Sequence, residues 1–449
     1  HHAAQAVRQY LNDSGFLEVE TPVLTRSTPE GARDYLVPSR LNPGKFYALP
    51  QSPQLFKQLL MMAGFDRYYQ IVKCYRDEDL RADRQPEFTQ IDMEMAFVNE
   101  EQIFRITEEL LKNLFEKVLG HKLEIPFPRL TYAEAIARYG TDKPDTRFGM
   151  ELVDVTPVFA NSNFRVFARL IEAGGTVKAL NLKGQAILPR SDLDKMQGKD
   201  NLANHYNVQT GAQGVAWIKV QENNWQGPVA KNLSGSEKDL LAKTAGLEPG
   251  DLILFAAGES KVVNPTLDII RGHFGHRLNL LDDKKYSFTW ITHFPLLEYD
   301  IAEKRYVAVH HPFTAPAEHD LEILAAQPEK VRSRAYDLVL NGNEIGGGSI
   351  RIHDHDLQQQ VFKALGIDKD EAQHKFGFML DALKYGAPPH GGIALGFDRL
   401  VMLICGADSI RDVIAFPKTQ KAACPMTQAP ESVSLEQLLE LSLKLDLPG

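Results

Sequence analysis

Residues 88–98 read Phe-Thr-Gln-Ile-Asp-Met-Glu-Met-Ala-Phe-Val, an alternating run from which the expected fold can be built outward. Successive side chains of a strand point to opposite faces, so Ile91, Met93 and Met95 share one face while Asp92 and Glu94 share the other. The run therefore predicts a strand with a buried apolar face and a second face that carries two carboxylates. A solvated strand face would show the same alternation, so the pattern alone leaves the role of the carboxylates open.

The pattern on either side of this strand predicts an α+β protein with an inserted domain, which has shorter strands than the rest. Helices are expected over 3–11, 103–118, 357–365 and 371–385, and strands over 16–20, 68–76, 336–340 and 343–352. Between them lie shorter strands such as 214–220 and 252–256, separated by turns rich in Gly, Asn and Lys. We expect four parts, namely 1–146, an inserted α+β domain over 147–282, 283–430, and a C-terminal helical tail over 431–449.

Composition limits the classes of protein that the chain can belong to. Its 449 residues are 43% hydrophobic and 24% charged, which is typical of a folded, multidomain protein and excludes a disordered or low-complexity chain. The formal net charge of −9 argues against a nucleic-acid packaging protein, but it is compatible with a local basic patch that binds RNA. The longest apolar stretch, residues 391–407, is interrupted by Asp398 and Arg399, so no membrane role is expected.

The loop that precedes the strand at 88–98 is unusually rich in charged residues. Residues 76–85 read Arg-Asp-Glu-Asp-Leu-Arg-Ala-Asp-Arg-Gln, in which three arginines stand among four acids. Such a loop suits the binding of a polyanion, because the acids keep the arginines oriented. A salt-bridged surface loop would have the same composition, so both interpretations stay open on charge pattern alone.

The hairpin predicted around Asn341-Gly342 carries a second pair of carboxylates. With a two-residue turn, Asp337 and Glu344 would lie on one face two rungs apart, an arrangement suited to sharing a magnesium ion through oxygen ligands. Strict alternation would place Arg351 on the face opposite Glu344, but the three glycines at 346–348 can hold a bulge or let a ligand approach the backbone. A purely structural role for these glycines is the alternative.

Residues 390–399 predict a glycine-flanked strand that runs into an apolar helix over 400–405. Asp398 suits the start of that helix. Arg399 does not, because the positive end of the helix dipole disfavours a cation unless an anion lies nearby. A ligand phosphate would supply that anion, and an acidic side chain of the protein would do so equally well.

Several other kinds of site are not indicated. His310 and His311 lack the spacing of a zinc site, which leaves them as uncharged donors to a polar ligand. The three cysteines are too far apart for a disulfide framework, which fits a reducing cytoplasm. No Walker loop or Gly-x-Gly-x-x-Gly turn is present, so any nucleotide would be bound in another way.

Taken together, these segments resemble the class II aminoacyl-tRNA synthetases, and specifically the bacterial-type aspartyl-tRNA synthetases. Residues 15–22, 75–78 with 88–92, and 396–399 resemble the three ordered motifs of the class. Residues 28–34, 51–58, 310–314 and 344–351 resemble blocks specific to aspartate. The resemblance covers about residues 3–430, and 147–282 resembles the insertion domain that bacterial members share with an amidotransferase subunit. The family's N-terminal OB-fold, which binds the anticodon, has no counterpart in the residues of this chain.

The resemblance implies an antiparallel sheet flanked by helices and a cytoplasmic homodimer that uses the first motif as its interface. It implies that ATP and magnesium take part in the reaction. Arg76 and Arg399 would be the catalytic residues, with Arg76 on the α-phosphate and Arg399 on the γ-phosphate. Asp337 and Glu344 would hold magnesium. The ATP site as a whole would comprise Arg76, Asp77, Glu78, Gln85, Glu344, Gly396, Phe397, Asp398 and Arg399, with Glu78 and Gln85 on the adenosine side.

The resemblance also implies that L-aspartate and the acceptor end of tRNA are the other substrates. The aspartate site would comprise Glu30, Gln54, Lys57, Arg76, Asp92, His310 and Arg351. Within it, Glu30, Gln54 and Asp92 would meet the ammonium group, while Lys57 and Arg351 would pair with the side-chain carboxylate. Because asparagine would leave both cations unpaired, we expect it to be rejected. Whether the tRNA for asparagine is charged as well as that for aspartate stays open.

Two other functions are compatible with the same motifs. One is a ligase of the same fold that passes the aspartyl-adenylate to ammonia and makes asparagine. The inserted domain of 147–282 argues against it, and the missing OB-fold argues for it. The other is an inactive relative that binds tRNA or an amino acid as a regulator. Such proteins lose the residues that bind phosphate and metal, and here Arg76, Glu344 and Arg399 are all present.

Replacing Lys57 or Arg351 by methionine should abolish aspartate activation and largely spare ATP binding, because each change removes half of a charge-assisted clamp on the substrate side chain. The measurement is aspartate-dependent exchange of pyrophosphate into ATP, beside a direct ATP-binding titration. Aspartate discrimination that stays unchanged in either variant would contradict the assignment.

Overall fold

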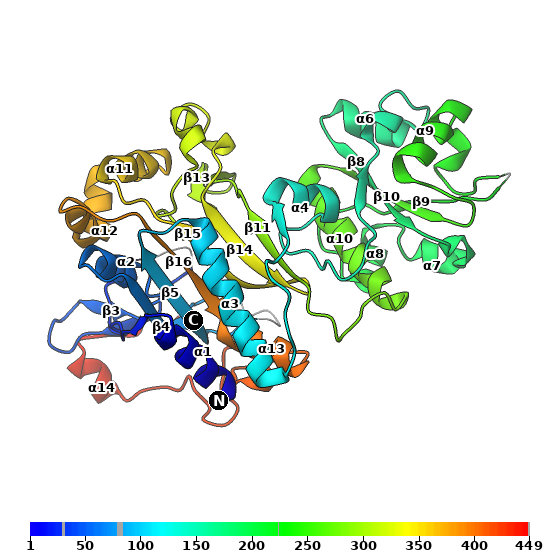
Figure 1. The fold of residues 1–449 in the computed structure, drawn as a ribbon. Coiled ribbons are helices and arrows are strands. Elements are labelled where there is room, and N and C mark those ends of the chain that lie inside the picture. Colours follow the sequence, from blue (N-terminus) through cyan, green and yellow to red (C-terminus); the bar gives the residue numbers. More distant parts are fainter. Residues whose placement is uncertain (29–31, 79–83, 223, 448–449) are drawn as a thin grey trace. The chain divides into compact units, whose positions relative to one another are not determined.

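The computed structural model describes residues 1–28, 32–78, 84–222 and 224–447 (Figure 1). The chain divides into two compact units, one made of residues 1–127, 292–338 and 345–449, the other of residues 128–291 and 339–344. Within the described ranges, none of the helices is both long enough and apolar enough to cross a membrane.

The first unit contains the strands and helices on which the sequence motifs lie. Its helices are α1 (His2–Asp13), α2 (Gln54–Met62), α3 (Glu100–Leu119), α11 (His355–Ala364), α12 (Lys369–Leu383), α13 (Phe397–Cys405) and α14 (Leu435–Glu440). Its strands are β1 (Leu17–Glu18), β2 (Leu36–Pro38), β3 (Phe46–Ala48), β4 (Arg67–Tyr75), β5 (Glu87–Ala96), β12 (Leu297–Asp300), β13 (Arg305–Ala308), β14 (Ala335–Leu340), β15 (Asn343–Ile350) and β16 (His390–Gly396). The last residues of β14 and the first residues of β15 fall in the second unit.

The large sheet of this unit follows the order β1-β4-β5-β16-β15-β14. Strand β5 pairs antiparallel with β4 on one side and with β16 on the other, placing Asp92 opposite Gln70 and Ala394. This confirms the antiparallel α+β fold expected from the sequence. The strand predicted over 16–20 is shorter than expected, because only Leu17 and Glu18 pair, in parallel, with β4.

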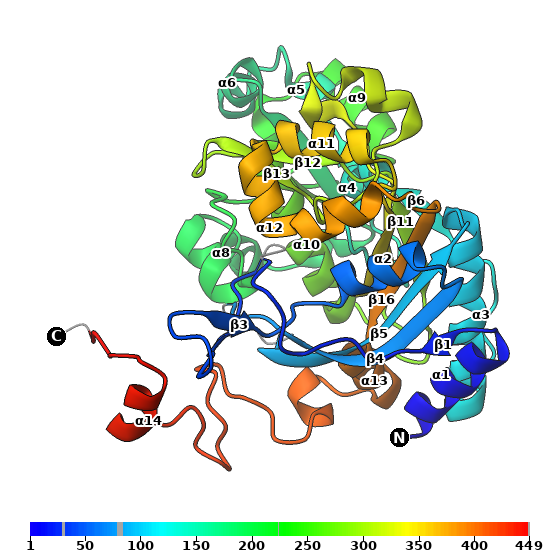
Figure 2. The same ribbon diagram turned by 90° about the vertical axis from the view of Figure 1, so that its left-hand side faces the viewer.

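Helices cover both faces of this sheet. On the face of Met93 and Met95 lies α3, which begins at a capping box between Asn99 and Gln102 and ends at the left-handed Gly120. This helix was predicted over 103–118, and the capping box was not. Figure 2 shows α1 beside α3, and α2 with α12 on the other side of the sheet. The face of β5 that carries carboxylates is therefore covered by α2 instead of being open to water.

The second unit is built around a smaller antiparallel sheet. Its strands β7 (Leu152–Asp154), β8 (Thr176–Leu182), β10 (Leu252–Gly258) and β9 (Ala216–Lys219) pair in that order. The unit also contains β6 (Arg129–Thr131), β11 (Phe288–Thr292, whose last residue falls in the first unit), α4 (Tyr132–Tyr139), α5 (Thr156–Phe159), α6 (Arg165–Glu172), α7 (Arg190–Asp194), α8 (Lys199–Tyr206), α9 (Gly235–Ala245) and α10 (Ser260–Arg277).

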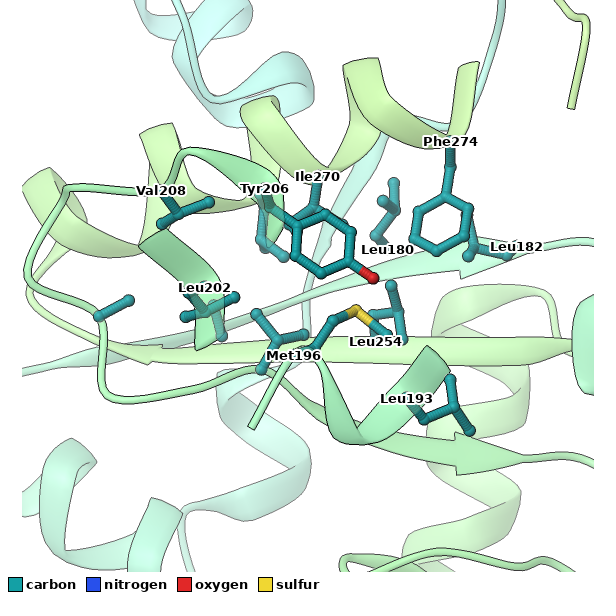
Figure 3. Packing of buried hydrophobic residues seen from close by; sticks show 14 of the residues in the cluster. Leu180, Leu182, Leu193, Met196, Leu202, Tyr206, Val208, Leu254, Ile270 and Phe274 are labelled. Carbon is teal, nitrogen blue, oxygen red and sulfur yellow. The ribbon is translucent and has the colours of Figure 1, made fainter. Parts of the chain in front are cut away.

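Both faces of the smaller sheet are buried. Leu254 packs with Leu180, Ile270 and Phe274 on one face, and Figure 3 shows these side chains gathered between the sheet and α10. The neighbouring residue Phe255 packs into a separate cluster on the other face. Because alternate residues of a strand point to opposite sides, the continuous apolar run of β10 is explained by burial of both faces.

A buried arginine in α10 stabilises the segment that leads into this sheet. Arg271 is 1% exposed, and its guanidinium donates hydrogen bonds to the carbonyl oxygens of Asp145, Phe148, Gly149 and Met150 at 2.8–3.1 Å. The guanidinium also lies 4.1 Å from the centroid of the Phe148 ring. One side chain therefore satisfies the buried carbonyl of Phe148 and three part-buried carbonyls around it.

Replacing Arg271 by methionine should lower the free energy of unfolding by about 3 kcal/mol or more, since the buried carbonyl of Phe148 and three part-buried carbonyls lose this donor together. Replacing Arg277 by methionine is the matched control, because this exposed residue of the same helix makes an ion pair with Asp192 and should cost less than about 1 kcal/mol. The measurement is urea unfolding of the full chain, and equal losses in the two variants would contradict the role given to Arg271.

Candidate active site

Helix α2 brings three polar side chains to the sheet on a single helical face. Gln54, Lys57 and Gln58 have the spacing i, i+3, i+4, which places them on neighbouring positions of the helix surface. They are 5%, 2% and 0% exposed. Polar side chains so deeply buried need partners in the protein, and these are found on the strands beneath the helix.

Lys57 forms ion pairs with both carboxylates of β5. Its Nζ lies 2.7 Å from Asp92 Oδ1 and 3.2 Å from Glu94 Oε2. Both acids are 0% exposed. The carboxylate face predicted from alternation along residues 88–98 is therefore real, and it is enclosed by α2.

Arg351, which directly follows β15, supplies the second cation. Its Nε and Nη2 donate to Glu94 Oε1 and Oε2 at 2.9 and 3.0 Å, a two-point contact that fixes the plane of the guanidinium. Its Nη1 donates to Ser349 Oγ at 2.6 Å and to His311 Nε2 at 2.7 Å. Because arginine has no acceptor, the Nε2 atom of His311 must carry a lone pair.

The buried charge cluster thus consists of Lys57, Arg351, Asp92 and Glu94, and its formal charges sum to zero. Burial acts to raise the pKa of Glu94, but Arg351 and Lys57 outweigh it and lower that pKa to about 2. Burial raises the pKa of Asp92, although Lys57 acts in the opposite direction. Asp92 Oδ2 is buried and accepts no hydrogen bond from any residue that the structure describes. The cluster is therefore balanced, with one acceptor atom left for a ligand.

Glycines make room for the carboxylates of the site. A Cβ atom on Gly392 of β16 would collide with Glu94 Oε2, and one on Gly347 of β15 would collide with Asp337 Oδ1. Residues 346–348 pair in continuous register with 393–395, so no bulge interrupts this pairing. Alternation consequently keeps Gly347, Ser349 and Arg351 on one face. Close approach of neighbouring backbone and side chains accounts for these glycines without a ligand.

The arginine predicted to bind the α-phosphate lies at the end of β4. The guanidinium of Arg76 lies 5.0 Å from the centroid of the Phe88 ring, and its backbone N–H donates to Pro86 O at 2.9 Å. Stacking on an aromatic ring holds a guanidinium plane in one orientation while leaving its edge available to an anion.

The polar loop after Arg76 is only partly described, since residues 79–83 lie outside the described ranges. Glu78 forms an exposed ion pair with Arg84 at 2.7 Å, and Asp77 lies 3.7 Å from Arg33. The side-chain amide of Gln85 donates to and accepts from the backbone of Lys418 at 3.0 and 2.8 Å. The adenosine contacts expected of Glu78 and Gln85 stay predictions.

The third motif forms the junction between β16 and α13, with Gly396 as the residue before the helix and Phe397 as its first residue. Asp398 Oδ2 accepts a 2.6 Å hydrogen bond from the backbone N–H of Thr89 on β5, and burial raises the pKa of this carboxyl group. Asp398 therefore ties the helix to the strand. Arg399 is partly exposed in the first turn, where the sequence predicted a γ-phosphate contact.

The remaining predicted residues are not all brought together. Asp337, 9% exposed, lies 3.4 Å from Nε2 of His310. Glu344 is exposed and belongs to the second compact unit, so its sharing of magnesium with Asp337 stays a prediction. Glu30 lies outside the described residues.

The sequence argument gave no role to Glu94, although this residue joins both cations of the site. Alternation along β5 placed it beside Asp92, but nothing in the sequence showed that Arg351, 257 positions away, would reach it. Ser349 and Gln58 were likewise missed, whereas His311 was expected only as an uncharged donor to a ligand and instead accepts from Arg351. The helical spacing of Gln58 from Gln54 was the one local signal for any of them.

Replacing Glu94 by glutamine should lower the free energy of unfolding by about 3–5 kcal/mol, because one buried cation loses its counter-charge. The matched control is Glu87→Gln at the start of the same strand, where a part-buried pair with Lys418 that water can still reach should contribute less than about 1 kcal/mol. Thermal unfolding of both variants checks this, and a Glu94 variant as stable as the control would contradict the pairing.

The site can be compared with known proteins. The chain matches the family described as tRNA synthetases class II (D, K and N) over residues 1–420. Two relatives named Aspartate--tRNA(Asp/Asn) ligase are similar along almost the whole chain. The protein from Desulfotalea psychrophila is 58% identical over 447 residues, which cover 99% of this chain and 72% of that protein. The protein from Desulfatibacillum aliphaticivorans is 56% identical, over 99% of this chain and 74% of that protein.

Two solved structures are similar in fold. The asparaginyl-tRNA synthetase from Pyrococcus horikoshii, complexed with asparaginyl-adenylate, has a TM-score of 0.50 and 18% identity, over 93% of this chain and 67% of that one. The asparaginyl-tRNA synthetase of Entamoeba histolytica, also in complex with asparaginyl-adenylate, has a TM-score of 0.50 and 17% identity, over 93% of this chain and 65% of that one. The extent of the family match and the identity to the curated relatives show that the chain belongs to the class II tRNA synthetases of the D, K and N group.

Proposed function

We propose that this protein activates L-aspartate with ATP and transfers it to the 3′ end of tRNA. The observation that carries the proposal is the buried charge cluster, which offers two cations and an unpaired carboxylate oxygen in one enclosed place. The relatives named as aspartate–tRNA ligases support the same substrates.

The first step joins the α-carboxylate of aspartate to the α-phosphorus of ATP. A carboxylate oxygen forms a bond to phosphorus, the bond to the bridging oxygen breaks, and pyrophosphate leaves. The carboxylate is already ionised and needs no general base, so the protein has to position the reactants and neutralise charge. Arg76, held by its stack on Phe88, would contact the α-phosphate and the reacting carboxylate, and Arg399 would contact the γ-phosphate.

The amino acid would bind through the side chains of the buried charge cluster. The unpaired Oδ2 of Asp92 is an acceptor for the ammonium group, together with Gln54. Lys57 and Arg351 would each donate a hydrogen bond to the side-chain carboxylate of the substrate. Both would keep their ion pairs with Glu94. His310 and Glu30 are proposed to complete the site.

The structure changes the reason why asparagine should be rejected. Lys57 and Arg351 already have counter-charges in Asp92 and Glu94, so asparagine would not leave them unpaired as the sequence suggested. Rejection of asparagine follows instead from the net charge of the buried site with its ligand. Aspartate brings one ammonium and one side-chain carboxylate into a neutral cluster, whereas asparagine brings the ammonium alone. The enclosed site would then hold one unmatched positive charge, which is costly in a buried environment.

Magnesium would assist on the ATP side. Asp337 and Glu344 offer carboxylate oxygens, the ligands that this hard cation prefers, and we propose them as its protein ligands. When bound, the ion would neutralise charge on the phosphates. Asp77 and Glu78 with Gln85, and Gly396 to Asp398, are proposed to frame the rest of the nucleotide site.

In the second step the 3′-terminal hydroxyl of tRNA would attack the aspartyl carbonyl and release AMP. We propose that the tRNAs for both aspartate and asparagine are acceptors, in line with the names of the relatives. A homodimer working in the cytoplasm is part of the same proposal.

The test is aspartate-dependent exchange of pyrophosphate into ATP, with and without tRNA, beside an assay for asparagine formed from aspartate and ammonia. Exchange without asparagine formation is the expected result, and charging of purified tRNA(Asp) and tRNA(Asn) then defines the acceptors. Formation of asparagine would identify an ammonia ligase instead. Absence of both activities would overturn the proposal.

A further inference from the structure

A chain of buried polar groups connects Gln54 to a histidine that no step above uses. Nε2 of Gln54 donates to Oε1 of Gln58 at 3.0 Å. Nε2 of Gln58 lies 3.1 Å from Nε2 of His390, whose Nδ1 lies 2.8 Å from the carbonyl oxygen of Pro388. Gln58 and His390 are both 0% exposed, so water does not compete for these bonds.

The last acceptor in this series, the carbonyl oxygen of Pro388, fixes the direction of each hydrogen bond from His390 to Gln54. A carbonyl oxygen can only accept, so Nδ1 of His390 must carry a proton toward Pro388. In a neutral ring, Nε2 is then the acceptor, and the amide nitrogen of Gln58 must face it. The carbonyl oxygen of Gln58 is thereby directed at Gln54, whose amide nitrogen donates to it. The carbonyl oxygen of Gln54 is left as an acceptor.

The opposite direction would reverse the amide of Gln54. If Nε2 of His390 carried a proton, Gln58 would have to turn its carbonyl oxygen toward the ring and its nitrogen toward Gln54. Gln54 would then direct its carbonyl oxygen at Gln58 and keep only N–H donors for other partners. Burial lowers the pKa of His390, which favours the neutral ring.

We propose that His390 and Gln58 are positioning residues that hold the Gln54 amide with its carbonyl oxygen available to the ammonium group of the amino acid. The inference rests on the proposed function, in which Gln54 and Asp92 receive that group. A reversed amide would direct an N–H donor at an ammonium, which has no acceptor. The hydrogen bonds from His390 through Gln58 therefore orient the Gln54 amide as an acceptor before the amino acid binds.

The first test examines the bond direction in the full chain without any substrate. Histidines are labelled with ¹⁵N, and the signal of His390 is assigned from its loss in His390→Gln. The expected result is a ring protonated at Nδ1 and unprotonated at Nε2. A proton on Nε2 would overturn the inference, whatever the activity of the enzyme.

The second test uses two changes at Gln58 that separate hydrogen bonding from packing. Gln58→Met has nearly the same size but removes the acceptor for Gln54, and the KM for aspartate should rise about tenfold or more while the KM for ATP stays unchanged. Gln58→Glu keeps an acceptor for Gln54, and its other oxygen accepts from a proton taken up on Nε2 of His390, so the KM for aspartate should stay within about threefold of the original.

A role in packing alone predicts the reverse order, because methionine fits an apolar interior better than a carboxylate does. An aspartate KM unchanged in Gln58→Met would overturn the inference. If neither variant folds, as judged by thermal unfolding, the tautomer of His390 decides the question. If the unaltered enzyme gives no aspartate-dependent exchange, the proposed function falls, while the bond direction is still decided by the labelled histidine.

Discussion

The shared carboxylate of Glu94 is the contact on which the site depends. It holds Lys57 and Arg351 in fixed positions although all three side chains are removed from water. Ion pairs this deeply buried contribute little net stability, because desolvation offsets most of the attraction. Their value lies in geometry, since neither cation can move without leaving a charge unmatched. Helix α2 and strands β5 and β15 are thereby held in register around one carboxylate.

Much of the fold of the first unit follows from periodicity. Alternation over residues 88–98 predicted β5, and helical spacing over 103–118 predicted α3. The same alternation exposed the carboxylate face of Asp92 and Glu94. It could not show what covers that face, because solvent and a packed helix leave the same pattern on a strand.

Contacts between residues that are distant in the sequence could not be predicted from it. Lys57 and Asp92 are 35 positions apart, and Arg351 and Glu94 are 257 apart, so their pairing depends on the tertiary fold. The resemblance to a family supplied Lys57 and Arg351 as ligands of a substrate, but not the fact that the protein already neutralises them. His390 was missed for the same reason, since it lies 332 positions from its partner Gln58, whereas Gln58 and Gln54 are neighbours on one helix.

The separation between Glu94 and Arg351 also has a consequence for how the protein is made. On the ribosome, Glu94 and Lys57 leave the exit tunnel long before Arg351 has been synthesised. At about 5–20 residues per second, the delay is roughly 13–50 s. Strand β16, which separates β5 from β15, appears later still. Until β16 is made, residues 87–96 lack the partner that pairs with one of their edges in the finished protein, and Lys57, Asp92 and Glu94 together carry two acids and one cation. The excess negative charge on that edge would discourage it from pairing with neighbouring chains, which is how charged edge strands resist aggregation.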